Sequence, residues 1–169
     1  PTPEPTPEPT PEPTPDPTPT APVVVVARDG FERTLPSGWG VAETGGPWTT
    51  AGPPAAFSVA DGAGRLAVAP GTTPVATLAD VVSRDGVVDA VLTLDRLPGT
   101  ELTLTVGQRQ IRGDRYETRV EIDAAGAVTL HLVTRSGTVE RVLATQEVAG
   151  LQITAGTPLR VRTSALGTT

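Results

Sequence analysis

The sequence predicts an all-β protein, an antiparallel β-sandwich of the jelly-roll type that follows a Pro-Thr-Glu linker. Three observations lead to this prediction. Val and Thr are frequent after residue 22, apolar and polar residues alternate in many segments, and turn residues recur about every ten positions. Alternation with a period of two indicates a strand that buries one face, and no segment shows a helical period. Many short strands in one domain are typical of sandwiches and jelly rolls.

The linker is a repeat, residues 1–22, in which proline occupies every second position as far as Pro19. Proline fixes φ and has no amide donor, so we expect a disordered, extended segment with polyproline II character. At about 3.1 Å per residue, the repeat would span on the order of 65 Å. We interpret it as a semi-rigid spacer that joins the domain to a catalytic or immunoglobulin-like domain upstream in the same parent chain. Residues 23–169 are then the folded domain.

Charge and composition exclude several classes of protein. The formal net charge is −6, and all 13 basic residues are Arg. Four of the 19 acidic residues lie in the linker, which leaves 15 acidic against 13 basic residues in the domain. A nucleic-acid-binding protein should show a basic excess, so we expect no nucleic acid partner. No apolar run approaches the ~20 residues of a membrane span, and the absence of cysteine excludes a disulfide framework.

The alternation predicts a series of short strands. Their expected ranges are 23–28, 47–50, 57–60, 65–69, 73–82, 87–95, 101–106, 115–123, 127–135, 138–145, 151–154 and 158–166.

The hairpin over 115–135 is the best-specified unit. Its apolar residues must share the buried face, because a register slip of one residue would invert every side chain. A three-residue loop that ends at Gly126 meets this condition, since Gly126 then occupies the position that requires a left-handed residue. Ile122 then lies opposite Val128. On the polar face, Arg119 lies opposite His131.

Four of the five aromatic residues lie between residues 29 and 66. Large aromatic side chains contribute most to the stability of a core, so we expect the fold to form around this segment. Alternation places Phe57 in the core, and we expect Phe31 to join it. Trp39 and Trp48 lie in Gly-rich loops where the strand phase cannot be assigned. They are therefore candidates either for the core or for stacking against a sugar.

Several motifs carry a resemblance to a known family. They are DGFERT at 29–34, GWG at 38–40, GGPWT at 45–49, FSV at 57–59 and LRVR at 159–162. Together they resemble a module of large secreted proteins from high-GC Gram-positive bacteria, similar to concanavalin A-like lectin/glucanase and laminin-G-like jelly rolls. The resemblance covers nearly all of residues 28–166. It implies a secreted, non-catalytic accessory module, and it implies further strands after LRVR, so that the domain would lack its last strands.

The catalytic motif of the jelly-roll glucanases is incomplete. Glu121 and Asp123 match the first part of a Glu-x-Asp-x-Glu strand, but residue 125 is Ala. Arg119 shares a face with Glu121, and a nearby positive charge lowers a carboxyl pKa, the wrong direction for a general acid. We therefore predict that the protein is not an enzyme. His131 is the only histidine, so we expect no multi-histidine metal site and no cofactor, while leaving a structural calcium ion open.

Two functions of different classes follow. The first is a carbohydrate- or cell-surface-binding accessory module of a secreted multidomain protein, with a polysaccharide or a cell-surface glycan as its partner. Its candidate ligand contacts are Trp39, Trp48, Arg119 and His131. The second is a purely structural spacer or cap domain that has no ligand.

Overall fold

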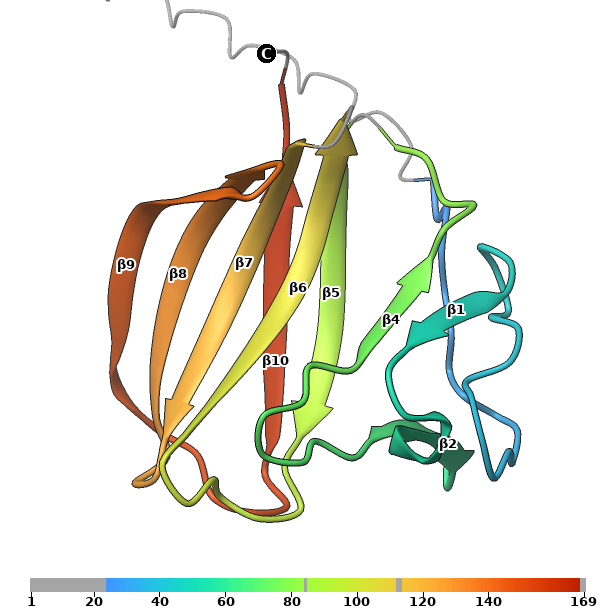
Figure 1. Ribbon diagram of the computed structural model, residues 1–169, viewed down its shortest axis with the longest axis horizontal. Helices are drawn as coiled ribbons and strands as arrows, with labels where there is room; N and C mark the ends of the chain where they lie inside the picture. The colour runs from blue at the N-terminus through green and yellow to red at the C-terminus, as the bar shows by residue number, and fades with distance from the viewer. Residues whose placement is uncertain (1–23, 84, 112–113, 168–169) are drawn as a thin grey trace, which may run out of the picture.

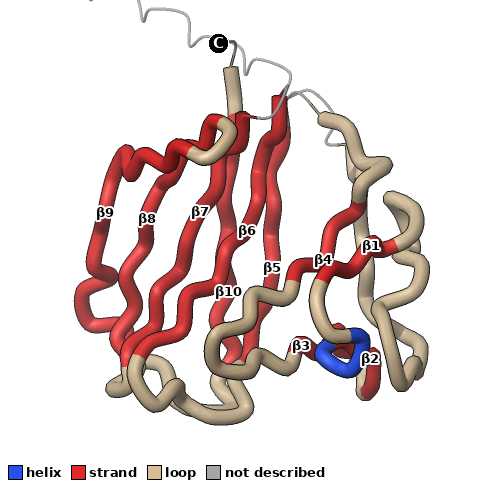
Figure 2. Tube along the Cα trace, in the orientation of Figure 1, coloured by secondary structure: helices blue, strands red, loops and turns tan. Residues whose placement is uncertain are grey.

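The computed structural model describes residues 24–83, 85–111 and 114–167, and it shows the all-β antiparallel architecture that the sequence predicts (Figures 1 and 2). The linker over residues 1–22 lies outside the described residues. The elements are β1 (Trp48–Ala51), the short 3-10 helix η1 (Pro54–Ala56), β2 (Phe57–Ala60), β3 (Ala63–Leu66), β4 (Val75–Leu78), β5 (Gly86–Thr93), β6 (Glu101–Ile111), β7 (Asp114–Asp123), β8 (Ala127–Ser136), β9 (Val139–Gln152) and β10 (Pro158–Ala165).

The main core lies between two layers. Strands β6, β7, β8 and β9 form one sheet in that order, and β10 pairs with β5 to form the facing layer. Alternate residues of each strand point between the layers, as expected for a sandwich. The buried core residues are Val120, Ile122, Val128, Ile153 and Val161. Burying a side chain of this size contributes about 2 kcal/mol.

The β7–β8 hairpin has the predicted register. Ile122 pairs with Val128, and Arg119 pairs with His131. Gly126 has a φ of 86°, in the left-handed region. Its amide donates to Asp123, and its carbonyl accepts a 2.9 Å hydrogen bond from the amide of Ile153. The turn residue therefore also anchors the segment that follows β9.

The two layers differ in width, so the four-stranded sheet is covered unevenly. β10 lies against β7, where the hydroxyls of Thr118 and Thr163 are 2.7 Å apart. Val120 on β7 is fully buried, whereas 38% of the surface of Leu132 remains exposed at an inward position of β8. The inner face over β8 and β9 is therefore open along part of its length.

The N-terminal part of the chain forms a smaller unit beside the sandwich (Figure 1). Strand β1 pairs with β4, and β2 pairs with β3. The β2–β3 hairpin turns at Asp61 and Gly62, whose φ angles are 55° and 70°. Positive φ at both central residues is the requirement of the two-residue hairpin turn that Asp-Gly favours. The strand that was expected to begin at residue 65 therefore begins at Ala63.

Two of the expected strands are wrong. The Val-rich segment at 23–28 is not part of a ladder, because within its described residues only Arg28 forms a bridge, to Thr44. High β-propensity cannot by itself supply a neighbouring strand. The segment 151–154 is not a separate strand either, because β9 continues through Gln152 before the chain turns toward β10.

We predict that Gly126→Ala strongly destabilises the protein. A Cβ at this position would lie 2.1 Å from the carbonyl oxygen of Ile153, and the positive φ disfavours any side chain. We expect a loss of at least about 2 kcal/mol in the free energy of unfolding, measured by urea denaturation. Gly99→Ala is the control, because a Cβ there meets no atom within 4 Å. Equal stability of the two variants would contradict the role of this turn.

Candidate functional site

The predicted ligand contacts lie in two separate places. Trp39 and Trp48 belong to the N-terminal unit, where their rings are 5.0 Å apart. Arg119 on β7 and His131 on β8 are opposite each other on the outer face of the four-stranded sheet. The structure therefore brings each pair together but does not combine the four residues into one site.

The N-terminal unit is built around the carboxylate of Asp29, whose side chain is only 3% exposed. Arg33 donates two hydrogen bonds to it, at 2.8 and 2.7 Å. The indole N–H of Trp48 donates a third at 2.6 Å, and the amide of Phe31 donates a fourth at 2.9 Å. A buried carboxylate needs such partners, since an unpaired buried charge is costly. Through Asp29, these hydrogen bonds join Phe31 and Arg33 of the DGFERT motif to Trp48 of the GGPWT motif.

The aromatic rings pack against one another around this carboxylate. Phe31 contacts Trp39 edge-on at 5.3 Å and stacks on Trp48 at 6.2 Å between ring centroids. Phe57, which is fully buried as predicted, meets Trp39 edge-on at 6.1 Å. The Phe31 ring also lies so close to Gly64 that a Cβ there would be 2.6 Å from it. Both tryptophans are half-buried in this cluster, and neither stands alone as an open platform.

The indole N–H groups of both tryptophans donate hydrogen bonds to residues of the same N-terminal unit. Trp39 donates its indole N–H to the carbonyl of Arg65 at 3.0 Å, and its own carbonyl accepts bonds from Arg33. The Arg33 guanidinium also lies 5.3 Å from the centre of the Phe31 ring, in cation–π range. Phe31 has a φ of 56°, which is uncommon for a residue with a side chain. The surrounding contacts thus hold a strained residue in place.

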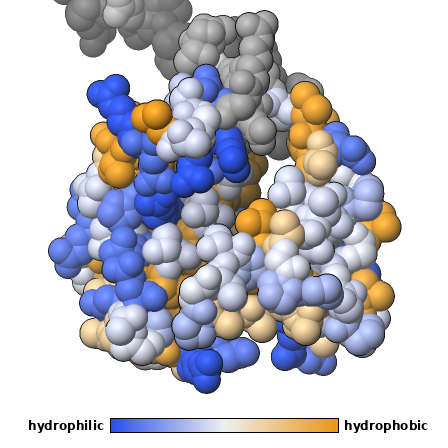
Figure 3. All heavy atoms as spheres, viewed as in Figure 1, coloured by the Kyte–Doolittle hydropathy of each residue, from blue (hydrophilic) through white to orange (hydrophobic). Residues whose placement is uncertain are grey.

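A network of charged side chains covers the outer face of β7, β8 and β9, where hydrophilic residues gather in Figure 3. Arg119 and Arg135 both donate to Glu140, at 2.8 and 2.7 Å. These two bonds lower the pKa of the Glu140 carboxyl to about 2. Glu140 is therefore ionised over the whole physiological range and cannot serve as a general acid.

His131 is held between two polar side chains of neighbouring strands. Its Nε2 lies 3.1 Å from a carboxylate oxygen of Glu121, and its Nδ1 lies 3.0 Å from the hydroxyl of Thr145. The side chain is 17% exposed, so the ring edge is only partly open to solvent. Glu117, at the far end of the network, is buried and 3.9 Å from Arg115. The outer face is thus a partly buried, ordered set of donors and acceptors.

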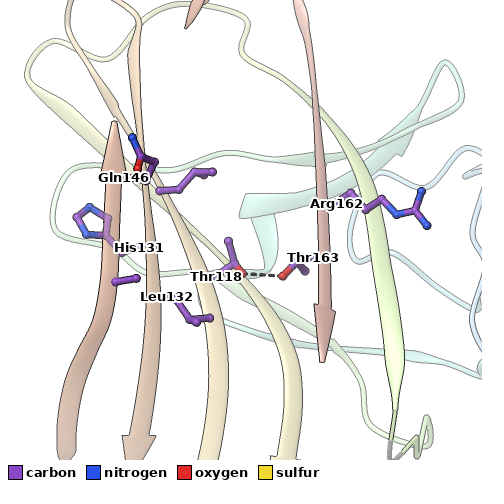
Figure 4. Close-up of a pocket in the computed structure, with 8 residues that line it drawn as sticks. Thr118, His131, Leu132, Gln146, Arg162 and Thr163 are labelled. Carbon is purple, nitrogen blue, oxygen red and sulfur yellow. Dashed lines mark hydrogen bonds between the residues drawn. The ribbon is translucent and has the colours of Figure 1, made fainter. Parts of the chain in front are cut away.

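A second feature is a cleft of about 260 Å³ between the inner face of β8–β9 and β10. Figure 4 shows that Leu132 and Gln146 line it, together with the bonded hydroxyls of Thr118 and Thr163. The side chain of Arg162 points away from it, so the Thr163 hydroxyl is the polar side-chain group that β10 directs toward this cleft. Sequence reasoning missed the cleft, because alternation shows which residues point inward but not how much of the inner face is covered.

The arrangement offers hydrogen-bond donors, hydrogen-bond acceptors and packing surfaces. Among the described residues, no group of three or more His, Cys, Asp or Glu side chains is placed to hold a metal ion. In the same part of the chain, no helix is long and apolar enough to cross a membrane. No family model, curated protein or solved structure matches the chain.

We predict that Asp29→Asn destabilises the domain by on the order of 3 kcal/mol at pH 7. The variant leaves the Arg33 guanidinium without its anionic partner in a half-buried site, and breaking such pairs is strongly unfavourable. Urea denaturation measures the change. Asp61→Asn is the control, because Asp61 is 82% exposed in its pair with Arg65, and exposed pairs contribute less than about 1 kcal/mol.

The same carboxyl group should make stability depend on pH. Burial raises the pKa of Asp29, but hydrogen bonds from Arg33, Trp48 and Phe31 outweigh this effect, and the net pKa is lowered. A group with a lowered folded pKa stabilises the protein above its unfolded pKa of about 3.9. That contribution is lost as the pH falls through the folded pKa. The stability difference between wild type and Asp29→Asn should therefore shrink below about pH 4. A difference that stays constant from pH 7 to pH 2.5 would contradict this assignment.

Proposed function

We propose that this protein is a non-catalytic accessory module that binds a polysaccharide or cell-surface glycan through the outer face of β7–β9. The observation that carries the proposal is the ordered row formed by Arg119, His131, Glu121 and Glu140. Sugar hydroxyls both donate and accept hydrogen bonds, so they require donors and acceptors alternating on one surface. Carboxylates and a guanidinium in fixed positions supply strong bonds of both kinds.

The electrostatics of the row favour binding over catalysis. A general acid needs a raised pKa, whereas two arginines lower the pKa of Glu140. The side chains are also held by their partners before any ligand arrives, and this order reduces the entropic cost of binding. A secreted location and an upstream domain joined by the linker belong to the same proposal.

One observation favours a purely structural function as the second candidate. The two tryptophans, which are the strongest candidates for sugar stacking, use their indole N–H groups and ring faces within the aromatic cluster. A spacer or cap domain would need this cluster only for stability. The two candidates differ in what happens at the outer face, because the structural candidate assigns no ligand to it.

Retention on insoluble ligands tests the binding function. The protein is mixed with cellulose, chitin, xylan and isolated Gram-positive cell walls, and the bound fraction is measured after centrifugation. We expect retention on at least one of them, with a loss of tenfold or more in affinity for Arg119→Gln, because loss of a charge-assisted bond costs about 1.5–3 kcal/mol.

A matched variant separates site-specific binding from general charge effects. Arg65→Gln removes the same charge from β3, where Arg65 pairs with the exposed Asp61, and it should leave retention unchanged. An equal loss in both variants would indicate non-specific attraction. No retention of the wild type on any of the four materials would reject the binding function and leave the structural candidate.

A further inference from the structure

One end of the outer face concentrates arginine side chains. Arg115 on β7 lies directly opposite Arg135 on β8, and Arg119 follows further along β7. We call these three residues the arginine end; the glycan-binding row proposed above includes only Arg119. Like charges directly opposite each other in a ladder are destabilising. Within the described chain, the acidic groups in salt-bridge range of the arginine end are Glu117 and Glu140, so three positive charges face two negative ones.

The pairing of Arg115 is loose. Its Nη1 lies 3.9 Å from a carboxylate oxygen of Glu117, which is beyond hydrogen-bond distance, and Glu117 itself is buried. The side chain of Arg115 is 47% exposed, and it makes no hydrogen bond within the described part of the chain. A guanidinium has five N–H donors, so Arg115 can still donate hydrogen bonds to a ligand at the surface.

The pairing of Arg135 is incomplete. Its Nη2 donates to Oε2 of Glu140, the same oxygen that accepts from Arg119, and its Nε is buried without a hydrogen-bond partner. A guanidinium can bind both oxygens of one carboxylate through Nε and Nη2, as Arg160 binds Asp89 at 2.8 and 2.6 Å. Glu140 uses only one oxygen for both arginines, so Arg135 lacks the second half of such a pair.

The side chain of Glu140 is placed where another carboxylate can replace it. It is 31% exposed, and it lies just after the β8–β9 turn, where Gly137 has a φ of 57°. A register shift in the β8–β9 ladder, between Leu132 and Val133, separates this part of β9 from the rest of the strand. Ion pairs that are open to solvent contribute little net stability. The bonds of Glu140 can therefore be exchanged for those of a ligand without disturbing the core.

We propose that the glycan bound at the outer face is an acidic polysaccharide, and that a carboxylate of its uronic acid units binds at the arginine end in place of Glu140. This inference rests on the glycan-binding function proposed above and names the class of glycan. In the free protein, Glu140 already shows that the space between Arg119 and Arg135 accepts a carboxylate. A ligand carboxylate that binds Arg135 through two oxygens also satisfies the buried Nε. Arg115 supplies a further positive charge beside it.

Matched polymers test the class of ligand. The full chain is titrated with polygalacturonate and with hyaluronate, each beside its methyl ester, which keeps the sugar backbone but has no free carboxylate. Isothermal titration calorimetry measures the affinities. We expect at least one of the two acidic polymers to bind about tenfold more tightly than its ester, because the ester cannot form charge-assisted bonds with the arginines. Dextran sulfate, a polyanion without carboxylates, should bind more weakly than that polymer.

Single variants test the arrangement at the arginine end. Arg115→Gln and Arg135→Gln should each reduce the affinity for the acidic polymer about tenfold. Glu140→Gln should raise it about threefold, because the variant removes the carboxylate that competes for the arginines. A gain in affinity cannot result from a loss of the fold. Glu147→Gln is the control, since it removes the same charge from an exposed position of β9 opposite Thr129. It should leave the affinity within about twofold, because charges far apart on the surface are screened.

The outcomes distinguish this inference from the function on which it rests. Equal affinity for the acidic polymers and their esters, still reduced by Arg119→Gln, would overturn the acidic class of ligand and leave glycan binding in place. Binding to none of these polymers and to none of the insoluble materials would reject both. Equal affinity for dextran sulfate would indicate general attraction to polyanions and overturn carboxylate recognition. A lower affinity in the Glu140→Gln variant, or an equal gain in Glu147→Gln, would overturn the exchange with Glu140.

Discussion

The register between β7 and β8 is the constraint on which most of the structure depends. Pairing Ile122 with Val128 directs the apolar side chains of both strands into the core. The same pairing places Arg119 opposite His131 on the other face, so one geometric choice produces both the core and the charged network. Gly126 maintains this choice, because its conformation and its contact with Ile153 leave no room for a side chain.

The N-terminal unit uses a different principle. Its two sheets have only two short strands each, and an isolated two-stranded ladder is marginally stable in water. A buried carboxylate supplies the missing stability by joining Phe31, Arg33 and Trp48 through hydrogen bonds. The aromatic rings then close around these bonds. In a chain with only five aromatic residues, concentrating four of them in one cluster gives this unit a core of its own.

The two layers of the sandwich differ in width, so the interior of the four-stranded sheet is covered unevenly. Where β10 covers β7, the interior is closed, and Val120 is fully buried. Beyond β10, the inner face over β8 and β9 is open along part of its length, where 38% of the surface of Leu132 is exposed. The outer face of the same strands carries the charged network. The four-stranded sheet thus has two surfaces of different chemistry, a charged outer face and an apolar inner face that is partly open.

The local pattern of the sequence determined the strands with clear alternation, the hairpin register and the burial of Phe57, because each depends on neighbouring residues along one or two strands. It also identified Arg119 and His131 as a facing pair. The tertiary structure alone decided that Asp29 is the buried partner of Trp48, 19 residues away, and that Glu140 joins Arg119 and Arg135. It also decided that the Val-rich segment at 23–28 has no ladder and that β10 leaves part of the sheet open. These features depend on which distant segments meet in space, and alternation along one strand carries no information about its neighbours.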